Sequence, residues 1–390
     1  MSIKSIIKNT AKFAAFKIIY PAVYGISRLR RVDKNKIIFA EIRGDKLSDN
    51  FRLIYERLKE VPELELTVFF ARNNSGGFGY LWRYAKLAAM TGNARCVLLN
   101  ETCNLFGAFR LRKETKLIQT WHACGAFKRW GKSCSDKSFG ETAEAQDKFP
   151  AHTNYTLVTV SSPECIPAYK EAFGLSSKSS CVQAVGVSRT DYYFMPDSRE
   201  RAFGHIYKIC PAARGKKIIL YAPTFRGEAD KAYIPNMLDI PSLKESFGED
   251  HVLLIKRHGF VRKRYDIPDE CRDFAFDVTE DTGIEKLIIT ADICITDYSS
   301  LIFEFSLMER PMIFFAFDLE EYYDSRGFFY SYDESFLPGK TAKTGGELTE
   351  LIKEAESSDC REVKAFRKRF MSACDGRSTE RIVKRILSAD

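Results

Sequence analysis

The sequence lacks the paired cysteines of a disulfide scaffold or a zinc site. Its eleven cysteines are odd in number and scattered, with no C-x-x-C pair, and some lie in apolar runs, such as Cys294 between Ile293 and Ile295. Disulfide-rich and zinc-binding chains instead space their cysteines closely and regularly. The pattern is therefore typical of reduced thiols in a cytosolic protein.

Long uncharged apolar runs are scarce too. In residues 1–31, Ile, Phe, Ala and Tyr alternate with lysines at positions 4, 8 and 12, and no run reaches 18 uncharged apolar residues. A membrane-spanning helix needs about 20 such residues, and a signal peptide needs a clean apolar core before its cleavage site. We therefore expect neither feature in this segment.

Excess charge is missing from most of the chain. Residues 1–36 carry nine basic side chains and one acidic side chain, Asp33, so they account for the whole net charge of +8. A nucleic-acid-binding domain spreads basic residues over one of its faces, so we expect no nucleic-acid partner.

The basic segment at residues 1–31 has two interpretations. The lysines at 4, 8 and 12 share one helical face, which favours an amphipathic, membrane-associating arm on an anionic membrane surface. The alternative is a basic helix packed on its own domain, because Pro21 interrupts the pattern.

Compositional bias and internal repeats are missing as well. Hydrophobic residues make up 45% of the chain and charged residues 29%, which excludes collagen-like and low-complexity classes. At roughly 100 to 200 residues per domain, the length predicts two or three globular domains.

What the chain does contain is a regular alternation of short β-rich runs and longer helical patterns. Strands are predicted at residues 36–40, 64–71, 95–99, 116–120 and 155–160, and in a second series at 216–221, 251–256, 274–277, 292–296 and 312–315. Helices are predicted at residues 50–61, 80–91, 241–247, 284–290, 301–309 and 345–357. This βαβ rhythm predicts parallel, doubly wound sheets.

The two series of strands predict two domains of similar size. The polar segment 197–214 separates them, so we place a boundary near residue 200, with domains at 32–200 and 201–390 after the arm. Two Rossmann-like domains facing a cleft form the α/β architecture called GT-B, in which an activated donor binds mainly to the C-terminal half. Ligands of such sheets bind at the carboxyl ends of the strands.

A buried strand ends at Asp297-Tyr298-Ser299-Ser300, and an apolar helical pattern follows at once. Ser299 or Ser300 can cap that helix, and free N–H groups with the two hydroxyls suit a pyrophosphate. The alternative is a plain helix cap in a βα loop, with Asp297 as a turn residue.

The segment Trp121-His122-Ala123-Cys124-Gly125 follows another predicted strand. Of the five histidines, His122 has the surroundings that best suit a general base, because its loop contains small residues. A structural histidine is the alternative. Cys124 as a nucleophile lacks a second histidine or acid at a recognisable spacing.

Two further predicted strands end in polar residues. One runs into Lys256-Arg257-His258, which could neutralise charge on a leaving phosphate, and the other into Thr224 and Arg226. Each could be an ordinary solvated strand end. Polar residues at four strand ends together indicate a ligand site.

These stretches resemble the CDP-glycerol glycerophosphotransferase family of teichoic acid and capsule synthesis. The resemblance covers residues 115–355 and rests on Trp121-His122, Gly186 to Asp191, Tyr221 to Thr224, Lys256 to His258, Ile295 to Ser300, Arg310 to Phe315 and Arg326 to Phe328. Two positions differ from the family pattern. Ala123-Cys124-Gly125 stands where the family often has Gly-Thr-Pro, and His258-Gly259 stands where it often has His-Pro.

The resemblance implies an enzyme at the cytoplasmic face of the cell membrane, bound peripherally. Such an enzyme transfers glycerol phosphate or ribitol phosphate from a CDP-polyol to an undecaprenyl-diphosphate-linked acceptor and releases CMP. It implies no cofactor, and no metal is required if the site residues neutralise the phosphate charge.

The resemblance also implies roles for individual residues. His122 is similar to the family's base and His258 to its second essential histidine, and both are predicted to be catalytic. The predicted donor-binding residues are Thr224, Arg226, Arg257, Asp297, Ser299 and Ser300, with Arg189 and Asp191 as further candidates.

Two other function classes stay open on the sequence alone. A sugar transferase using a nucleotide-sugar would have the same two-domain frame and the same kind of phosphate site. A non-catalytic, membrane-bound scaffold would keep the frame with a degenerate nucleotide pocket.

Overall fold

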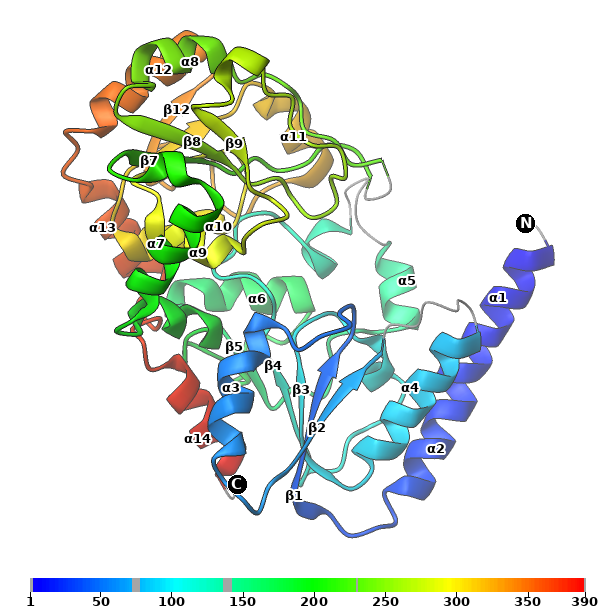
Figure 1. Cartoon of the computed structure of the whole chain (residues 1–390). Coiled ribbons are helices and arrows are strands. Elements are labelled where there is room, and N and C mark those ends of the chain that lie inside the picture. The colour runs from blue at the N-terminus through cyan, green and yellow to red at the C-terminus, as the bar shows by residue number, and fades with distance from the viewer. Residues whose placement is uncertain (1–2, 72–77, 136–141, 229–230, 389–390) are drawn as a thin grey trace. The chain divides into compact units, whose positions relative to one another are not determined.

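The computed structural model describes residues 3–71, 78–135, 142–228 and 231–388 of the chain (Figure 1). The chain forms two compact units. Unit 1 comprises Met1–Ala123, Trp130–Asp191 and Ala373–Asp390, and unit 2 comprises Cys124–Arg129 and Tyr192–Ser372. Most of the first half of the chain is therefore in unit 1 and most of the second half in unit 2. The exceptions are residues 124–129, which belong to unit 2, and residues 373–390, which belong to unit 1.

Unit 1 is built on a six-stranded parallel sheet. Its strands are β1 (Asp33–Glu41), β2 (Glu65–Phe70), β3 (Ala94–Leu99), β4 (Lys116–Gln119), β5 (Leu157–Thr159) and β6 (Val182–Gln183), in the order β2-β1-β3-β4-β5-β6. Every pair of neighbours runs parallel.

Helices cover both faces of this sheet, because successive side chains of a strand point to opposite faces. Ile37 and Phe39 of β1 pack with α3 (Asp49–Lys59) and α14 (Ser378–Leu387). Ile38 and Ala40 pack with α2 (Tyr20–Ser27) and α4 (Phe78–Thr91) on the other face (Figure 1). Helices α5 (Ala143–Lys148) and α6 (Ile166–Phe173) complete the unit.

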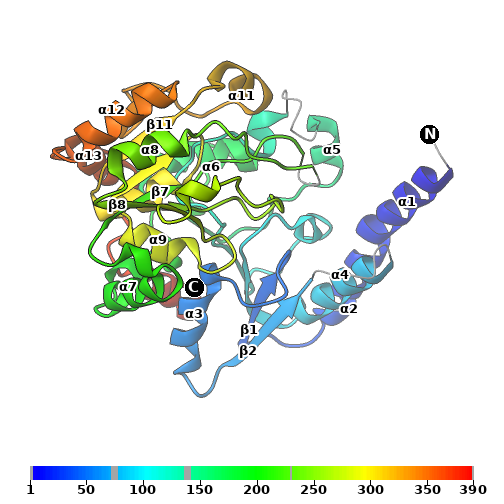
Figure 2. The same cartoon turned by 45° about the horizontal axis from the view of Figure 1, so that its top comes forward.

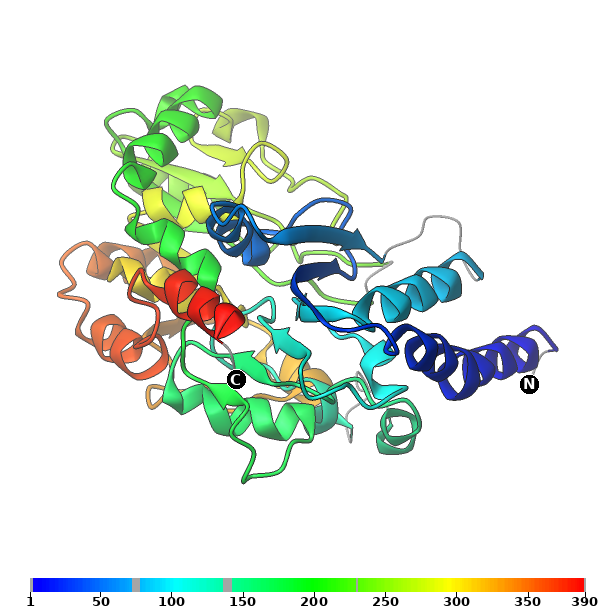
Figure 3. The ribbon, with the colours of Figure 1, turned by 90° about the horizontal axis from the view of Figure 1, so that it is seen from below.

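The chain begins with a nearly continuous helix that runs alongside α4 (Figure 3). Helix α1 (Ile3–Ala14) is followed by a π-helical turn (Ala15–Ile19) and by α2, which carries Pro21 in its first turn. The N–H of Tyr20 bonds to the carbonyl of Ala15, five residues back. This widened turn lets the helix continue past Pro21, where the sequence predicted an interruption.

Unit 2 is built on a second six-stranded parallel sheet. Its strands are β7 (Lys217–Tyr221), β8 (His251–Ile255), β9 (Ala275–Asp277), β10 (Ile293–Thr296), β11 (Met312–Phe315) and β12 (Gly339–Ala342), in the order β12-β11-β10-β7-β8-β9. Helices α8 (Ile240–Phe247) and α12 (Gly345–Ala355) pack on one face. Helices α7 (Ser198–Ile209), α9 (Ile284–Thr290) and α10 (Leu301–Phe305) lie on the other (Figures 1 and 2). Helices α11 (Leu319–Arg326) and α13 (Arg361–Phe370) complete the unit.

Each sheet has one point where the order of strands reverses. In unit 1 the chain places β2 on one side of β1 and β3 on the other, and in unit 2 it places β8 on one side of β7 and β10 on the other. Ligands of open α/β sheets bind at the carboxyl ends of the strands beside such a switch point. The ends of β1 and β3, and of β7 and β10, are therefore the first places to look for a site.

The predicted fold class, α/β with two doubly wound parallel sheets of the GT-B kind, is confirmed. The ten strands predicted from the sequence all form, with ends shifted by up to three residues. The short strands β6 and β12 were not predicted, and the polar segment 197–214 contains α7. In the part of the chain that the structure describes, no helix is long and apolar enough to cross a membrane.

Candidate active site

The polar strand ends of unit 1 gather around His122. Glu41 ends β1, Asn100 and Glu101 follow β3, and His122 follows β4. Because β1, β3 and β4 are neighbours in the sheet, these ends meet at one edge beside the switch point.

His122 lies in a loop whose backbone is tightly constrained. The preceding residue, Trp121, has a φ of 56°, a left-handed conformation that non-glycine residues rarely adopt and that is concentrated at functional sites. The Arg189 guanidinium donates a 2.6 Å hydrogen bond to the carbonyl oxygen of His122 and a 2.9 Å bond to Asn50 Oδ1. The loop is thereby tied to the start of α3.

The imidazole of His122 has one nitrogen occupied. Nδ1 lies 3.3 Å from the carbonyl oxygen of Asn100 and 3.3 Å from Glu101 Oε1. A carbonyl oxygen only accepts hydrogen bonds, so Nδ1 carries the proton of the neutral ring. Nε2 then keeps a lone pair and can accept a proton.

The surroundings keep this ring neutral. Its side chain is 42% exposed, but the pKa of His122 is lowered to about 4, mainly because the protein behind the ring excludes water and in part because of the charge of Arg189. A histidine with that pKa is unprotonated at pH 7, as a general base must be.

Asp191 is buried, and its carboxylate bonds to the protein backbone. Its buried carboxylate accepts the N–H groups of Ser378 at 3.0 Å and Thr379 at 2.6 Å, which open α14. Asp191 therefore caps the helix that returns to unit 1 from the end of the chain.

In unit 2, the predicted donor residues Thr224, Arg226 and Asp297 bind one another at the ends of β7 and β10. Asp297 accepts hydrogen bonds of 2.9 Å from both the N–H and the hydroxyl of Thr224. Arg226 Nη2 donates to Asp297 at 3.1 Å, and Nη1 donates to the Thr224 carbonyl at 2.9 Å. Thr224 and Asp297 are both buried.

Asp318, which follows β11, completes this network and was not predicted from the sequence. Its carboxylate accepts two hydrogen bonds from the Arg226 guanidinium, at 2.6 and 2.9 Å, and one from the Tyr298 hydroxyl at 2.9 Å. Burial opposes the charge of both partners, but their mutual bonds dominate, so the pKa of Asp318 is lowered and that of Arg226 raised. Since these bonds engage every nitrogen of the guanidinium, Arg226 supports the loop that carries Ser299.

Ser299 and Ser300 lie between this network and α10, and both are partly exposed. The Ser299 hydroxyl accepts the N–H of Leu301 at 3.2 Å. Ser300 occupies the N-cap position of α10 without a side-chain capping bond. The expected cap is therefore made by Ser299, and both hydroxyls can still donate to a ligand.

The basic cluster after β8 divides into buried and exposed members. Arg257 is buried and donates to Asp277 at 2.6 Å and to the carbonyl of Val261. Lys256 donates to the carbonyls of Thr279 and Thr282, and burial lowers the pKa of its ammonium. His258 is the exposed member, so of the three it is placed to meet a ligand.

His258 has the opposite tautomer from His122. The backbone N–H of Phe260 donates to His258 Nδ1 at 3.2 Å, so the neutral ring carries its proton on Nε2. The ring centres of Phe225 and Phe260 lie 4.7 and 4.8 Å from that of the imidazole and 5.4 Å from each other, so the three rings pack as one cluster. His258 Nε2 is therefore a hydrogen-bond donor.

A group that could hold a metal ion lies at the other end of β8. Asp250, His251 and Glu356 bring their ligand atoms within 4.8 Å of one another. Lys217 donates to Glu356 at 2.8 Å, and His251 Nδ1 lies 2.6 Å from Asp250. The cluster joins β7, β8 and the end of α12 through these contacts, at the amino ends of the strands.

The structure thus sorts the predicted residues by what they contact. His122 in unit 1 and His258 in unit 2 are exposed, and Ser299 and Ser300 in unit 2 are partly exposed. Thr224, Arg226, Arg257, Asp297, Arg189 and Asp191 bind neighbouring protein groups. Glu101 and Asp318 were missed, although the rule of polar residues at strand ends could have found both.

Comparison with known proteins gives a consistent result. A profile of the family CDP-Glycerol:Poly(glycerophosphate) glycerophosphotransferase matches residues 22–388. The teichoic acid ribitol-phosphate primase of Bacillus spizizenii is 35% identical over 362 residues, which cover 92% of each chain. The teichoic acid glycerol-phosphate primase of Bacillus subtilis is 30% identical over 296 residues, covering 75% of this chain and 73% of the relative.

Solved structures show the same fold. The structure of the wall teichoic acid polymerase TagF has a TM-score of 0.76 at 21% identity, covering 99% of this chain and 98% of that one. A TagF variant soaked with CDPG superposes equally well, at 20% identity. A UDP-N-acetylglucosamine 2-epimerase has a TM-score of 0.52 at 13% identity, covering 92% of this chain and 96% of that one. On the family match and the identity to its relatives, the chain belongs to the CDP-glycerol:poly(glycerophosphate) glycerophosphotransferase family.

Proposed function

We propose that this polyol-phosphate transferase moves ribitol phosphate from CDP-ribitol to a hydroxyl of an undecaprenyl-diphosphate-linked acceptor, with release of CMP, in wall teichoic acid synthesis. The observation that carries the choice of ribitol is the match to the ribitol-phosphate primase over nearly the whole of both chains. The glycerol-phosphate primase matches at lower identity and over less of its length.

In the proposed mechanism, the acceptor hydroxyl attacks the β-phosphorus of the donor. His122 Nε2 takes the hydroxyl proton while a new P–O bond forms, and the P–O bond to CMP breaks. The neutral ring and its Nδ1–H tautomer support this role. The step is an in-line phosphoryl transfer that relies on positioning and electrostatics.

Unit 2 holds the donor in this proposal. Ser299, Ser300 and the Nε2–H of His258 donate hydrogen bonds to the diphosphate and to the charge that develops on CMP. The loops after β7, β8 and β10 that carry these groups are held by hydrogen bonds of Thr224, Arg226, Arg257 and Asp297. Arg189 and Asp191 support unit 1 in the same way.

The domain roles follow from this assignment. Unit 1, which contains the expected domain at residues 32–200, receives the acceptor, and unit 2, which contains most of residues 201–390, receives the CDP-polyol. Open α/β sheets bind ligands beside the switch point, and each unit has one such point, which supports both roles.

We further propose that residues 1–31 attach the enzyme peripherally to the cytoplasmic face of the membrane. The helix packs Phe16, Tyr20 and Tyr24 into unit 1. Its outer side and the turn that follows it expose a row of apolar side chains, here called the apolar row: Ile18, Ile19, Ile26 and Leu29. Such a row beside basic residues suits an anionic lipid surface.

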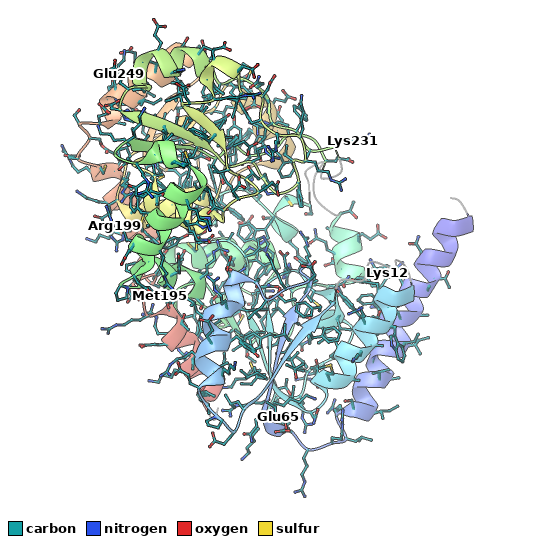
Figure 4. The ribbon with its side chains drawn as sticks, viewed as in Figure 1. Lys12, Glu65, Met195, Arg199, Lys231 and Glu249 are labelled. Carbon is teal, nitrogen blue, oxygen red and sulfur yellow. The ribbon has the colours of Figure 1, made fainter. Side chains whose placement is uncertain are left out.

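The arm also contacts the rest of unit 1 through Lys12 of α1, the residue labelled in Figure 4. Its ammonium lies 4.5 Å from the centre of the Phe149 ring, and that of Lys17 lies 5.9 Å away. The two interpretations of the arm are therefore compatible, because one side packs on unit 1 and the other side is open.

The test is a donor competition with the full-length protein. CDP-ribitol, CDP-glycerol and a panel of nucleotide-sugars are incubated with a lipid-linked acceptor, and CMP release is followed. We expect CDP-ribitol to be used with the highest kcat/KM, and the product mass to grow by ribitol-phosphate increments. A preference for CDP-glycerol would show that the transferred group is glycerol phosphate and not ribitol phosphate.

Two other results would overturn the reaction class itself. Turnover of a nucleotide-sugar without CMP release would assign the protein to the sugar transferases. Failure of every nucleotide to bind in calorimetry would favour a scaffold.

A further inference from the structure

We propose that Glu101 is a positioning residue for His122, which holds the imidazole in the Nδ1–H tautomer and compensates the positive charge that the ring gains. The inference rests on the proposed function, in which His122 is the base. It adds a carboxylate to a site in which only the histidine was expected.

The geometry places Glu101 beside the correct nitrogen. Glu101 Oε1 and the Asn100 carbonyl oxygen both lie 3.3 Å from His122 Nδ1. A neutral imidazole with two acceptors at Nδ1 keeps its proton there and leaves Nε2 open for the acceptor hydroxyl. A carboxylate that orients a catalytic histidine in this way is a recurrent arrangement in enzymes with a histidine base.

Glu101 is itself held in place by neighbours. Its side chain is 16% exposed, and Oε2 lies 3.5 Å from the Nε of Arg43. Gln119, at the end of β4, donates a 3.1 Å hydrogen bond to the Glu101 carbonyl. The carboxylate therefore stays close to the ring.

A second carboxylate nearby has a different task. Glu41 is buried and accepts the N–H of Ser48 at 2.6 Å and the amide of Asn100 at 2.8 Å. These bonds fix Asn100, the residue whose carbonyl also faces His122. Glu41 thus supports the second acceptor, while Glu101 contacts the imidazole directly.

The charges around the pair set the direction of the electrostatic effect. Arg189 and Arg43 both lower the pKa of His122, and burial, with a contribution from Glu41, raises the pKa of Glu101. When His122 takes the substrate proton, two guanidinium groups oppose the new charge. The Glu101 carboxylate is the negative group within 3.3 Å that offsets them.

Comparison of Glu101→Gln and Glu101→Ala with the wild type tests this role. In both variants we expect kcat at pH 7 to fall by about tenfold to a hundredfold, with little change in the KM for the CDP-polyol, because the proposed donor contacts lie in unit 2 and Glu101 belongs to unit 1. The loss is smaller than the roughly 10⁴-fold known for an orienting aspartate, because the Asn100 carbonyl still holds Nδ1–H.

A readout that is independent of activity is the ¹⁵N NMR signal of His122 in histidine-labelled protein, assigned with His122→Gln. We expect the wild type to show a protonated Nδ1, and Glu101→Ala to shift population toward the Nε2–H form. Glu101→Gln should shift it less, because its amide oxygen can still accept. Glu60→Gln, an exposed carboxylate at the end of α3, serves as the matched control without effect.

Two outcomes would overturn the inference: an Nε2–H tautomer in the wild type, or unchanged kcat in both folded variants. Failure of the proposed function looks different. If the enzyme released no CMP from any CDP-polyol, the NMR signal would still report whether Glu101 holds Nδ1–H. If His122→Ala stayed active, the base assignment would fail while the tautomer result stood.

Discussion

At the scale of single residues, the site separates into side chains that can meet a ligand and side chains that hold them. The sequence placed His122 correctly after a strand, because an apolar run followed by a polar loop is a local signal. It could not show the tautomer, since the two acceptors at Nδ1 come from the end of β3 and depend on how β3 and β4 pair. Likewise, nothing local indicated that Arg226 would engage Asp318, which lies 92 residues further along the chain.

The first residue-scale prediction concerns His122. His122→Ala should lower kcat by about a hundredfold or more, as expected for the loss of a general base, and should leave CDP-polyol binding nearly intact. Steady-state CMP release and calorimetric donor titration measure the two quantities. In the wild type, the low pKa of His122 keeps the base unprotonated from pH 6 to 8, so its titration should cause no loss of rate in that range.

Near wild-type turnover in His122→Ala would remove this residue from the mechanism. His205→Ala is a suitable control, because that histidine is partly exposed, lies on α7 in unit 2, and bonds only to the carbonyl of Asp281 among the contacts described.

The second residue-scale prediction concerns the serine pair. Replacing Ser299 and Ser300 together by Ala should weaken donor binding by at most a few kcal/mol, because each hydrogen bond to a charged phosphate contributes about 1.5 to 3 kcal/mol. Calorimetry with the CDP-polyol provides the measurement, and Ser335→Ala, at an exposed turn of unit 2, is the control. Unchanged affinity would reduce the pair to the helix cap that Ser299 already forms.

At the scale of elements, prediction succeeded where a run of β-branched residues is buried and failed where the element is short or polar. Strand β12 exposes Lys340 and Thr341, and β6 has two residues, so neither shows the apolar run of a central strand. Helix α7 lies in a polar segment and buries only Ser198, Ala202 and Ile206. Its pattern becomes visible only once the sheet that it covers is known.

The element-scale prediction concerns α14 and its cap. Asp191→Ala removes the acceptor of two N–H groups at the start of the helix, which should cost about 1 to 2 kcal/mol of stability. Calorimetric unfolding should show a lower Tm, and hydrogen exchange should quicken in α14. Asp375→Ala, which breaks a half-exposed ion pair with Arg381, should cost less than about 1 kcal/mol.

Equal effects of the two substitutions would contradict the assignment of Asp191 as the cap. A large loss of donor affinity in Asp191→Ala, with α14 still protected, would instead restore Asp191 as a ligand-binding residue.

At the scale of the whole molecule, the sequence predicted two doubly wound sheets because each strand and helix carries its own signal. It did not predict which unit the chain segments at 124–129 and 373–390 join. Those assignments depend on contacts between distant residues, such as Ile382 and Ile386 of α14 packing with Phe51 of α3. No local pattern of hydrophobicity specifies such a partner.

The arm shows why a test at this scale must respect packing. Deleting residues 1–31 would remove Phe16, Tyr20 and Tyr24 from the core of unit 1, so loss of membrane binding could follow from unfolding. The sharper change is Ile18→Glu with Ile26→Glu, because these side chains are 64% and 71% exposed. The buried side of the helix stays intact.

We expect the affinity of this double variant for vesicles of anionic lipid to fall by about a hundredfold or more relative to the wild type. Each apolar side chain withdrawn from water contributes about 1.5 to 3 kcal/mol, and the new carboxylates are repelled by the lipid charge. Sedimentation with vesicles measures the effect, and Met237→Glu, at an exposed apolar residue of unit 2, is the control.

High salt should weaken the binding of the wild type to the vesicles, since its basic residues are screened over about 8 Å at physiological ionic strength. Turnover of a short, soluble acceptor should be unchanged in the variant, because the proposed site residues lie outside the arm, whereas turnover of the lipid-linked acceptor in vesicles should fall. If the double variant sedimented as the wild type does, the apolar row would not be the membrane contact, and the arm would remain only a helix packed on unit 1.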